Sequence, residues 1–150
     1  MKYIEFFFLL LFAGCYPSYV EEAEVTNMNE LNLNFVDTVA DIDYLISIIE
    51  SSKNIESKHI GFTGRKSHVY GCYEKLLDAA SDSLWVELSY SKSPVMRCYA
   101  CNALLSNEST NFLSVRNRLL KDTTEVCCQT RDMFFYFTIG YVVENNWLGR

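Results

Sequence analysis

Apolar and polar positions follow their most regular pattern in residues 91–105, SKSPVMRCYACNALL. The apolar side chains recur at spacings of three and four residues, at Met96, Tyr99, Ala100, Ala103 and Leu104. Such spacing places them on one face of a helix, the face that a globular domain buries. Ser93 can accept a hydrogen bond from the free amides of the first turn, and Pro94 suits the first helical position. The pattern predicts a capped, amphipathic helix that begins at Pro94.

Comparable spacing predicts helices on both sides of this segment. They cover about 37–51, 67–80, a short stretch after Ser81, 109–121 and 131–145. Ser51–Asn54 has loop composition, and the glycines of Gly61–Gly64 permit a second break in the pattern. We expect Ile60 and Phe62 to enter the core from this loop. The whole pattern predicts an all-α fold of five or six helices, with residues 35–150 forming a single helical domain.

The last predicted helix, residues 131–145, has a second interpretation. In a helix, Met133, Phe134 and Phe137 would share one face, and we expect these side chains to be buried in the core. Residues Phe134–Ile139 are, however, all aromatic or β-branched, a composition that favours strands. A helix is the prediction here, and a strand over Phe134–Ile139 is the alternative.

One sequence motif resembles a known family. The order proline, any residue, apolar, arginine, then alanines and a leucine at helical spacing is carried by Pro94, Met96, Arg97, Ala100, Ala103 and Leu104. It resembles the second helix of a HEAT-type helical repeat, and the resemblance covers roughly residues 67–130. The resemblance implies a HEAT-like α-α hairpin or superhelix, whose concave surface would bind other proteins. It also implies that Arg97 packs between repeats and pairs with an acid, for which Asp122 is the candidate.

The first residues have the pattern of an export signal. Lys2 supplies a basic start, Phe6–Phe12 is an unbroken apolar run, and the small residues Ala13 and Gly14 lead to Cys15. Small residues directly before a cysteine resemble the lipobox of bacterial lipoproteins. The resemblance implies a signal peptide over residues 1–14 and a diacylglyceryl group on the thiol of Cys15.

Other interpretations of this segment stay open. A secretory signal of the eukaryotic kind, cut near Ala13 or Gly14, would leave Cys15 free, and an ordinary amphipathic start would belong to the folded domain. Residues 15–34 are acidic and rich in asparagine, without apolar periodicity. This composition is typical of a flexible tether between a membrane anchor and a domain.

Composition limits the classes of partner. Apolar residues make up 49% of the 150 residues, which is enough for one core. The net charge of −6 argues against binding to nucleic acid or to an anionic lipid surface, because a broad acidic face repels phosphate. We therefore expect no nucleic-acid partner.

Candidate chemical groups are few. Cys98 and Cys101 have the spacing of a redox pair, but they lie inside the predicted helix instead of at its amino terminus, so packing thiols are the better interpretation. The pairing of disulfides, if any, is left open among Cys72, Cys98, Cys101, Cys127 and Cys128. His59 and His68 have no cysteine between them and offer too few ligands for zinc. We predict no catalytic residue, no metal and no cofactor.

These observations favour a binding protein over an enzyme. We expect a non-catalytic scaffold that is anchored through Cys15 in the bacterial cell envelope, on the periplasmic side or the cell surface, and that binds a protein partner. A secreted protein is the alternative location. A small acidic inhibitor or immunity protein, or an enzyme whose site is not recognisable in the sequence, are the alternative functions.

The lipobox leads to a direct prediction. Metabolic labelling with a fatty-acid analogue should mark the wild-type chain and leave the Cys15→Ala chain unlabelled and unprocessed, because the thiol accepts the lipid. Gel fluorescence and the mass of the mature chain measure both effects. Equal labelling of the two chains would contradict acylation at Cys15.

Overall fold

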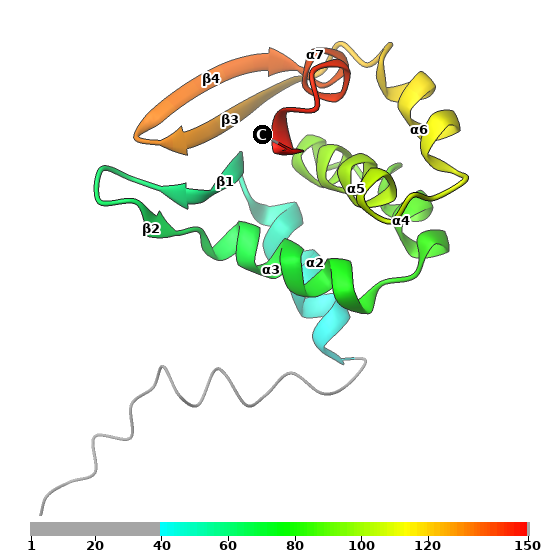
Figure 1. Cartoon of the computed structure of the whole chain (residues 1–150), viewed down its shortest axis with the longest axis horizontal. Helices are drawn as coiled ribbons and strands as arrows, with labels where there is room; N and C mark the ends of the chain where they lie inside the picture. Colours follow the sequence, from blue (N-terminus) through cyan, green and yellow to red (C-terminus); the bar gives the residue numbers. More distant parts are fainter. Residues whose placement is uncertain (1–39, 150) are drawn as a thin grey trace, which may run out of the picture. The chain divides into compact units, whose positions relative to one another are not determined.

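The computed structural model describes residues 40–149, which form a mixed α/β fold of helices packed against a four-stranded sheet (Figure 1). The first half contains α2 (Ala40–Ser51), β1 (Asn54–Ile60), β2 (Arg65–Lys66), α3 (His68–Ala79), α4 (Asp82–Leu88) and α5 (Pro94–Ser106). The second half contains α6 (Phe112–Leu119), β3 (Glu125–Arg131), β4 (Met133–Thr138), α7 (Ile139–Glu144) and the 3-10 turn η1 (Trp147–Gly149). No helix within this part of the chain is long and apolar enough to cross a membrane.

Serine side chains fix the starts of three helices. Ser67 accepts a hydrogen bond from the amide of Tyr70 at 2.8 Å, and Ser93 accepts one from Met96 at 3.3 Å. Ser81 caps α4 in the same way. Each cap satisfies an amide that has no partner within its own helix, so the predicted helix starts at these serines are confirmed.

The sheet joins segments that are far apart in the sequence. Its strand order is β2-β1-β3-β4, with β1 and β3 parallel and the other neighbours antiparallel. Ile55 pairs with Cys128, which in turn pairs with Phe135, so these three side chains share one face. Ile55 and Cys128 are fully buried. The helices pack on this face, and β2 and β4 form the two edges of the sheet.

Helix α5 occupies the centre of the domain. It buries eight of its side chains, including the whole of the stripe that was predicted from residue spacing. Tyr99 is fully buried, and its hydroxyl donates to the carbonyl oxygen of Glu56 at 2.9 Å and accepts from the amide of Glu56 at 3.1 Å. Its ring packs on Tyr73, which packs edge-on against the fully buried Trp85. A buried tyrosine therefore satisfies its own polar group and ties α5 to β1.

The prediction of an all-α fold is wrong, and with it the prediction of a HEAT-like superhelix over residues 67–130. The segments on both sides of α5 contribute strands, and β1 and β3 pair with each other across most of the domain. In β1 only Ile55 and Ile60 are buried, so the strand lacks the alternation that would have marked it. Long-range pairing stabilises strands whose local sequence does not specify them.

The prediction of one helix over residues 131–145 is also wrong. The segment forms β4 up to Thr138 and the short helix α7 after it, so the alternative of a strand over Phe134–Ile139 is nearly what the structure contains. Thr138 ends the strand and caps α7 by accepting from the amide of Tyr141 at 3.3 Å. Phe62 does not enter the core, although Ile60 does. The predicted signal peptide, Cys15 and the tether over residues 15–34 lie outside the described residues.

A close approach at Gly140 fixes the position of α7. Its amide donates to the carbonyl oxygen of Asp122 at 3.0 Å, and a Cβ atom at this position would lie 2.5 Å from the carbonyl oxygen of Leu120. Backbone atoms cannot move aside as a flexible side chain can. The loop between α6 and β3 therefore requires glycine at position 140.

This contact predicts opposite effects for two glycine substitutions. Gly140→Ala should lower the free energy of unfolding by about 1–3 kcal/mol, as overpacking does. Gly71 lies in α3 with open space around its missing Cβ, so Gly71→Ala should raise that free energy by up to about 1 kcal/mol through helix propensity. Urea unfolding followed by circular dichroism measures both. Equal effects of the two substitutions would contradict the close approach.

Candidate functional site

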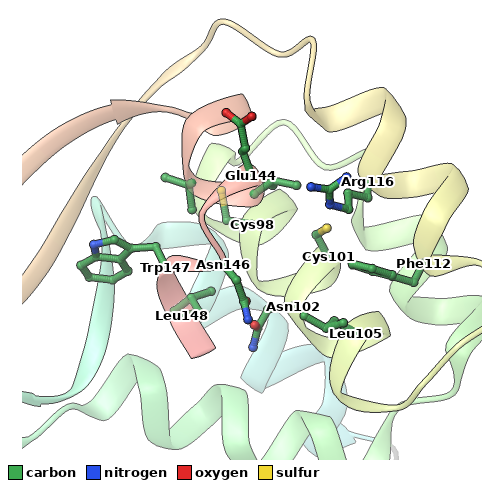
Figure 2. Close-up of a pocket in the computed structure, with 12 residues that line it drawn as sticks. Cys98, Cys101, Asn102, Leu105, Phe112, Arg116, Glu144, Asn146, Trp147 and Leu148 are labelled. Atoms are coloured by element: carbon green, nitrogen blue, oxygen red, sulfur yellow. The ribbon is translucent and has the colours of Figure 1, made fainter. Parts of the chain in front are cut away.

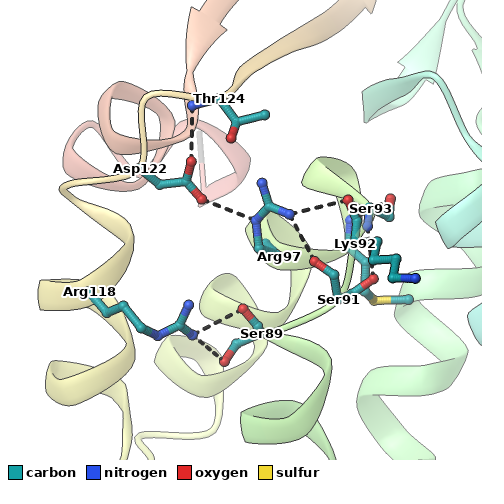
Figure 3. Close-up of polar contacts among 9 residues, drawn as sticks. Ser89, Ser91, Lys92, Ser93, Arg97, Arg118, Asp122 and Thr124 are labelled. Carbon is teal, nitrogen blue, oxygen red and sulfur yellow. Dashed lines mark hydrogen bonds and ion pairs between the residues drawn. The ribbon is translucent and has the colours of Figure 1, made fainter.

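Arg97 and Asp122, the pair implied by the repeat resemblance, lie together in the structure (Figure 3). The Nε atom of Arg97 lies 3.1 Å from Oδ2 of Asp122, and the two side chains are 13% and 21% exposed. The N–H bond of Nε is not directed at this oxygen, so the contact is an ion pair and not a linear hydrogen bond. A terminal guanidinium nitrogen of Arg97 donates to the carbonyl oxygens of Ser91 and Lys92 at 2.8 and 3.2 Å.

The electrostatics of this pair are those of a structural contact. Burial alone would raise the pKa of Asp122, but hydrogen bonds from Thr124 and the charge of Arg97 outweigh burial and hold that pKa below its ordinary value. One of these bonds runs from the amide of Thr124 to Oδ1 at 3.0 Å. The carboxylate is thus ionised at neutral pH and fully engaged with the protein.

A second arginine holds the same connection between α4 and α5. Arg118 of α6 donates to the carbonyl oxygen of Ser89 at 3.0 Å and to its hydroxyl at 2.7 Å (Figure 3). Its guanidinium carbon also lies 3.9 Å from the centre of the Tyr90 ring. Arg97 and Arg118 together fix the position of α5 relative to α6. These two arginines and their partners Asp122, Ser89 and Tyr90 are here called the arginine clasp.

A pocket of about 230 Å³ lies between α5, α6, α7 and η1 (Figure 2). Its apolar lining comes from Leu105, Phe112, Val142, Val143, Trp147 and Leu148. Its polar lining comes from Cys98, Cys101, Asn102, Arg116, Glu144 and Asn146. A volume of this size admits a small molecule or a single side chain of a partner.

The thiols that line the pocket are poor nucleophiles. Burial raises the pKa of Cys101 to about 11, although the positive charges of Arg116 and Arg118 act in the opposite direction. Burial also raises the pKa of Cys98 well above its ordinary value, and it raises that of Cys128 to about 12. A thiol must ionise to react, so these cysteines act as packing groups at neutral pH. All five cysteines of the described segment are free thiols.

Neither histidine lines the pocket. His59 and His68 are both exposed, and Nε2 of His68 lies 3.9 Å from the thiol sulfur of Cys72. Within residues 40–149, no cluster of three or more histidine, cysteine, aspartate or glutamate side chains could hold a metal ion.

The exposed aromatics of β4 form a surface that the sequence did not predict. Phe134, Phe135 and Tyr136, here called the β4 edge, are 53%, 38% and 73% exposed. Phe134 and Tyr136 pair with Gln129 and Cys127 and so lie on the face opposite to the core-facing Phe135. Both faces of the strand therefore present aromatic side chains to the solvent.

One signal in the sequence could have indicated this surface. Consecutive aromatics in a strand point alternately to both faces, and a sheet with antiparallel strands commonly has one face on the core and the other in solvent. An uninterrupted run such as Phe134–Phe137 must therefore expose some of its rings wherever it forms an edge strand. The helical interpretation hid this consequence, because it placed the aromatics on one buried face.

Comparison of the chain with protein-family models, with curated proteins and with solved structures found no match.

The Arg97–Asp122 contact predicts coupled effects on stability. Arg97→Ala should lower the free energy of unfolding by about 3 kcal/mol at neutral pH, because it leaves a partly buried carboxylate and two carbonyl groups without their donor. Urea unfolding of both single variants, with Asp122→Ala, and of the double variant measures the coupling, and additive losses would show that the two residues act independently.

The same contact predicts a dependence on pH. The pKa of Asp122 is lower in the folded state, so the stability it contributes is present above its ordinary pKa and is lost as the pH falls through the folded value. The loss caused by Arg97→Ala should therefore shrink below about pH 4. A loss that stayed constant down to pH 2 would contradict the ion pair.

Proposed function

We propose that this chain is a non-catalytic binding module of the cell envelope, held at a membrane through an acylated Cys15, and that it binds an extended segment of a partner protein along β4. The exposure of the β4 edge is the observation that supports the proposal. An extended segment that pairs with β4 would add a fifth strand to the sheet, and its side chains would contact the aromatic rings on both faces.

The position of β4 provides the backbone groups for such binding. It lies at the end of the strand order, so one of its sides pairs with β3 and the other has no neighbouring strand among the described residues. An edge strand of this kind presents unpaired amide and carbonyl groups to the solvent. These groups can bind the main chain of a partner whatever its side chains are.

The side chains of β4 lack the usual protection of a sheet edge. Natural edges carry lysine, proline or a bulge that prevents pairing with another chain. The sequence of β4, MFFYFT, contains neither residue, and it pairs with β3 from Thr138 to Met133 without a break in register. A segment this apolar and this uniform would aggregate if nothing covered it, which favours a partner in the working state of the protein.

The aromatic side chains of β4 are suited to binding a partner protein. Tyrosine and phenylalanine provide large contact areas with few rotatable bonds, so they lose little conformational freedom on binding. Tyr136 in addition carries a hydroxyl group that can bind a polar atom of the partner. We expect the partner's segment to be extended and apolar at alternate positions, because residues that alternate along a strand meet Phe134 and Tyr136 on one face.

A photo-crosslinking amino acid at position 136 tests this function in cells of the source organism. It should give a crosslink to a protein other than this chain, whereas the same amino acid at Tyr44, a 55% exposed tyrosine on α2, should not give that product. Tyr136→Lys should then weaken binding of the purified crosslinked partner by tenfold or more, since a charged lysine at the edge opposes strand pairing. Calorimetric titration measures the affinity.

The control for charge is Tyr44→Lys, which should leave the affinity unchanged. Crosslinks from position 136 to a second copy of this chain alone would contradict binding of a foreign partner. Equal affinity of the Tyr136→Lys and wild-type chains would contradict recognition along β4.

A further inference from the structure

We propose that the end of the sheet that carries Phe62 docks on the anionic surface of a phospholipid bilayer. The docking surface, here called the basic tip, consists of Phe62, Arg65, Lys66 and Arg131. It is separate from the β4 edge, and it takes from the proposed function only the statement that Cys15 keeps the domain near a membrane.

Two turns meet at the basic tip. The turn between β1 and β2 and the turn between β3 and β4 lie at the same end of the sheet, on the side away from α4 and α6 (Figure 1). The amide of Gly61 donates to the carbonyl oxygen of Arg131 at 2.7 Å, which joins the first turn to the second. Residues from both turns therefore form one surface.

Phe62 is held in the solvent by its turn. Its side chain is 89% exposed, the highest value among the exposed large apolar residues of the described chain. Gly61 and Gly64 have φ angles of 74° and 68°, and the amide of Gly64 donates to the carbonyl oxygen of Gly61 at 3.0 Å. This conformation closes a tight turn that presents the ring outward. A phenyl ring in water forgoes the stabilisation that an apolar environment gives, so its exposure favours a binding role.

Positive charge surrounds the ring. Residues 57–67 contain Lys58, Arg65 and Lys66 and no aspartate or glutamate, although the whole chain has a net charge of −6. Lys58 pairs with Glu74 at 2.9 Å, whereas Arg65, Lys66 and Arg131 are exposed and form no ion pair with other described residues. Asp132 is the one acidic neighbour in the second turn.

This distribution of charge matches an anionic bilayer. Basic side chains near such a surface are attracted to lipid phosphates and each strengthens binding by roughly fivefold, and an aromatic ring is stabilised at the level of the headgroups. The acidic remainder of the chain is repelled by the same surface, so the domain should orient with the tip toward the lipid. The net charge of the whole chain predicts repulsion from anionic lipid, and the proposed docking makes the basic tip an exception to that prediction.

The small size of the basic tip favours lipid over nucleic acid. A protein that tracks a nucleic-acid backbone neutralises many phosphates along a groove or stripe, whereas the tip offers one apolar side chain and three cations that form no ion pair within residues 40–149. A single ring with a few flanking cations is sufficient for an interfacial contact when a lipid anchor already holds the chain at the membrane.

Depth-dependent fluorescence quenching tests the docking. The full chain with Phe62→Trp is reconstituted in vesicles of phosphatidylglycerol and phosphatidylcholine whose acyl chains carry bromine, a quencher of tryptophan. The matched control is Leu113→Trp, at a 65% exposed position on α6, and Trp85 and Trp147 give the same background in both chains. The tryptophan at position 62 should be quenched and shifted to shorter wavelength, and the one at position 113 should not.

Charge is tested in the same assay. Adding Arg65→Gln and Lys66→Gln to the Phe62→Trp chain should lower the ratio of docked to undocked protein by about 25-fold, and vesicles of phosphatidylcholine alone should abolish the quenching. Adding Tyr136→Lys should leave it unchanged, which separates this docking from binding along β4. Equal quenching at positions 62 and 113 would overturn the proposal, as would quenching that does not depend on phosphatidylglycerol. If single-stranded DNA changed the fluorescence of the tryptophan at position 62 and brominated lipid did not quench it, the result would contradict docking on lipid and favour a nucleic-acid ligand.

Discussion

The fold depends on the position of α5 between the sheet and the other helices. One side of this helix places the Tyr99 hydroxyl on the backbone of β1, and its first turn is held by the Arg97 ion pair with Asp122. The rings of Tyr99, Tyr73 and Trp85 continue the contact from the sheet to α3 and α4. The hydroxyls of Tyr99 and Tyr73 have hydrogen-bond partners, so these two large residues are buried without leaving their hydroxyl groups unsatisfied.

The arginine clasp and the two proposed binding surfaces, the β4 edge and the basic tip, lie in different parts of the domain. Arg97, Arg118 and Gly140 fix the connections among α4, α5, α6 and α7, where side chains and backbone have little room to move. The exposed aromatic and basic side chains of the two proposed binding surfaces are on the sheet and its turns, at the β4 edge and at the basic tip. A sheet anchored from one face by helices can present such groups without strain, since binding at its edge or end does not disturb the core.

Helices could be predicted from the sequence wherever a capping residue precedes an apolar stripe at helical spacing. The sheet could not be predicted. Ser67, Ser81 and Ser93 mark helix starts because a hydroxyl acts on amides only two or three residues away. The pairing of Asn54 with Cys127 has no such local signal. The motif that resembles a HEAT repeat consists of Arg97 and an alanine-rich stripe, and a buried helix of another fold can carry both features. The motif therefore predicted α5 and the pairing of Arg97 with Asp122 correctly. The repeat architecture that it implied around α5 was wrong.

The candidate surfaces could be predicted only in part, for a related reason. Residue type showed that Phe62 and Phe134 are apolar, and apolar residues were assigned to the core. Their exposure follows from topology, because β4 is an edge and the Gly61–Gly64 turn projects from the end of the sheet. The interpretation of Cys98 and Cys101 as packing thiols rested on their position a full turn or more inside the predicted helix, and both side chains are buried in α5.

The parallel pairing of β1 with β3 also governs when the domain can fold. Antiparallel neighbours can pair as soon as a short turn forms, but β1 acquires its parallel neighbour only after α3, α4, α5 and α6 have been made. Before that point its ladder is limited to the two residues of β2, so the amino-terminal half has no complete sheet on which to pack. Such nonlocal contacts slow folding. The sheet therefore cannot close until β3 (Glu125–Arg131), near the carboxyl end of the described residues, is available to pair with β1.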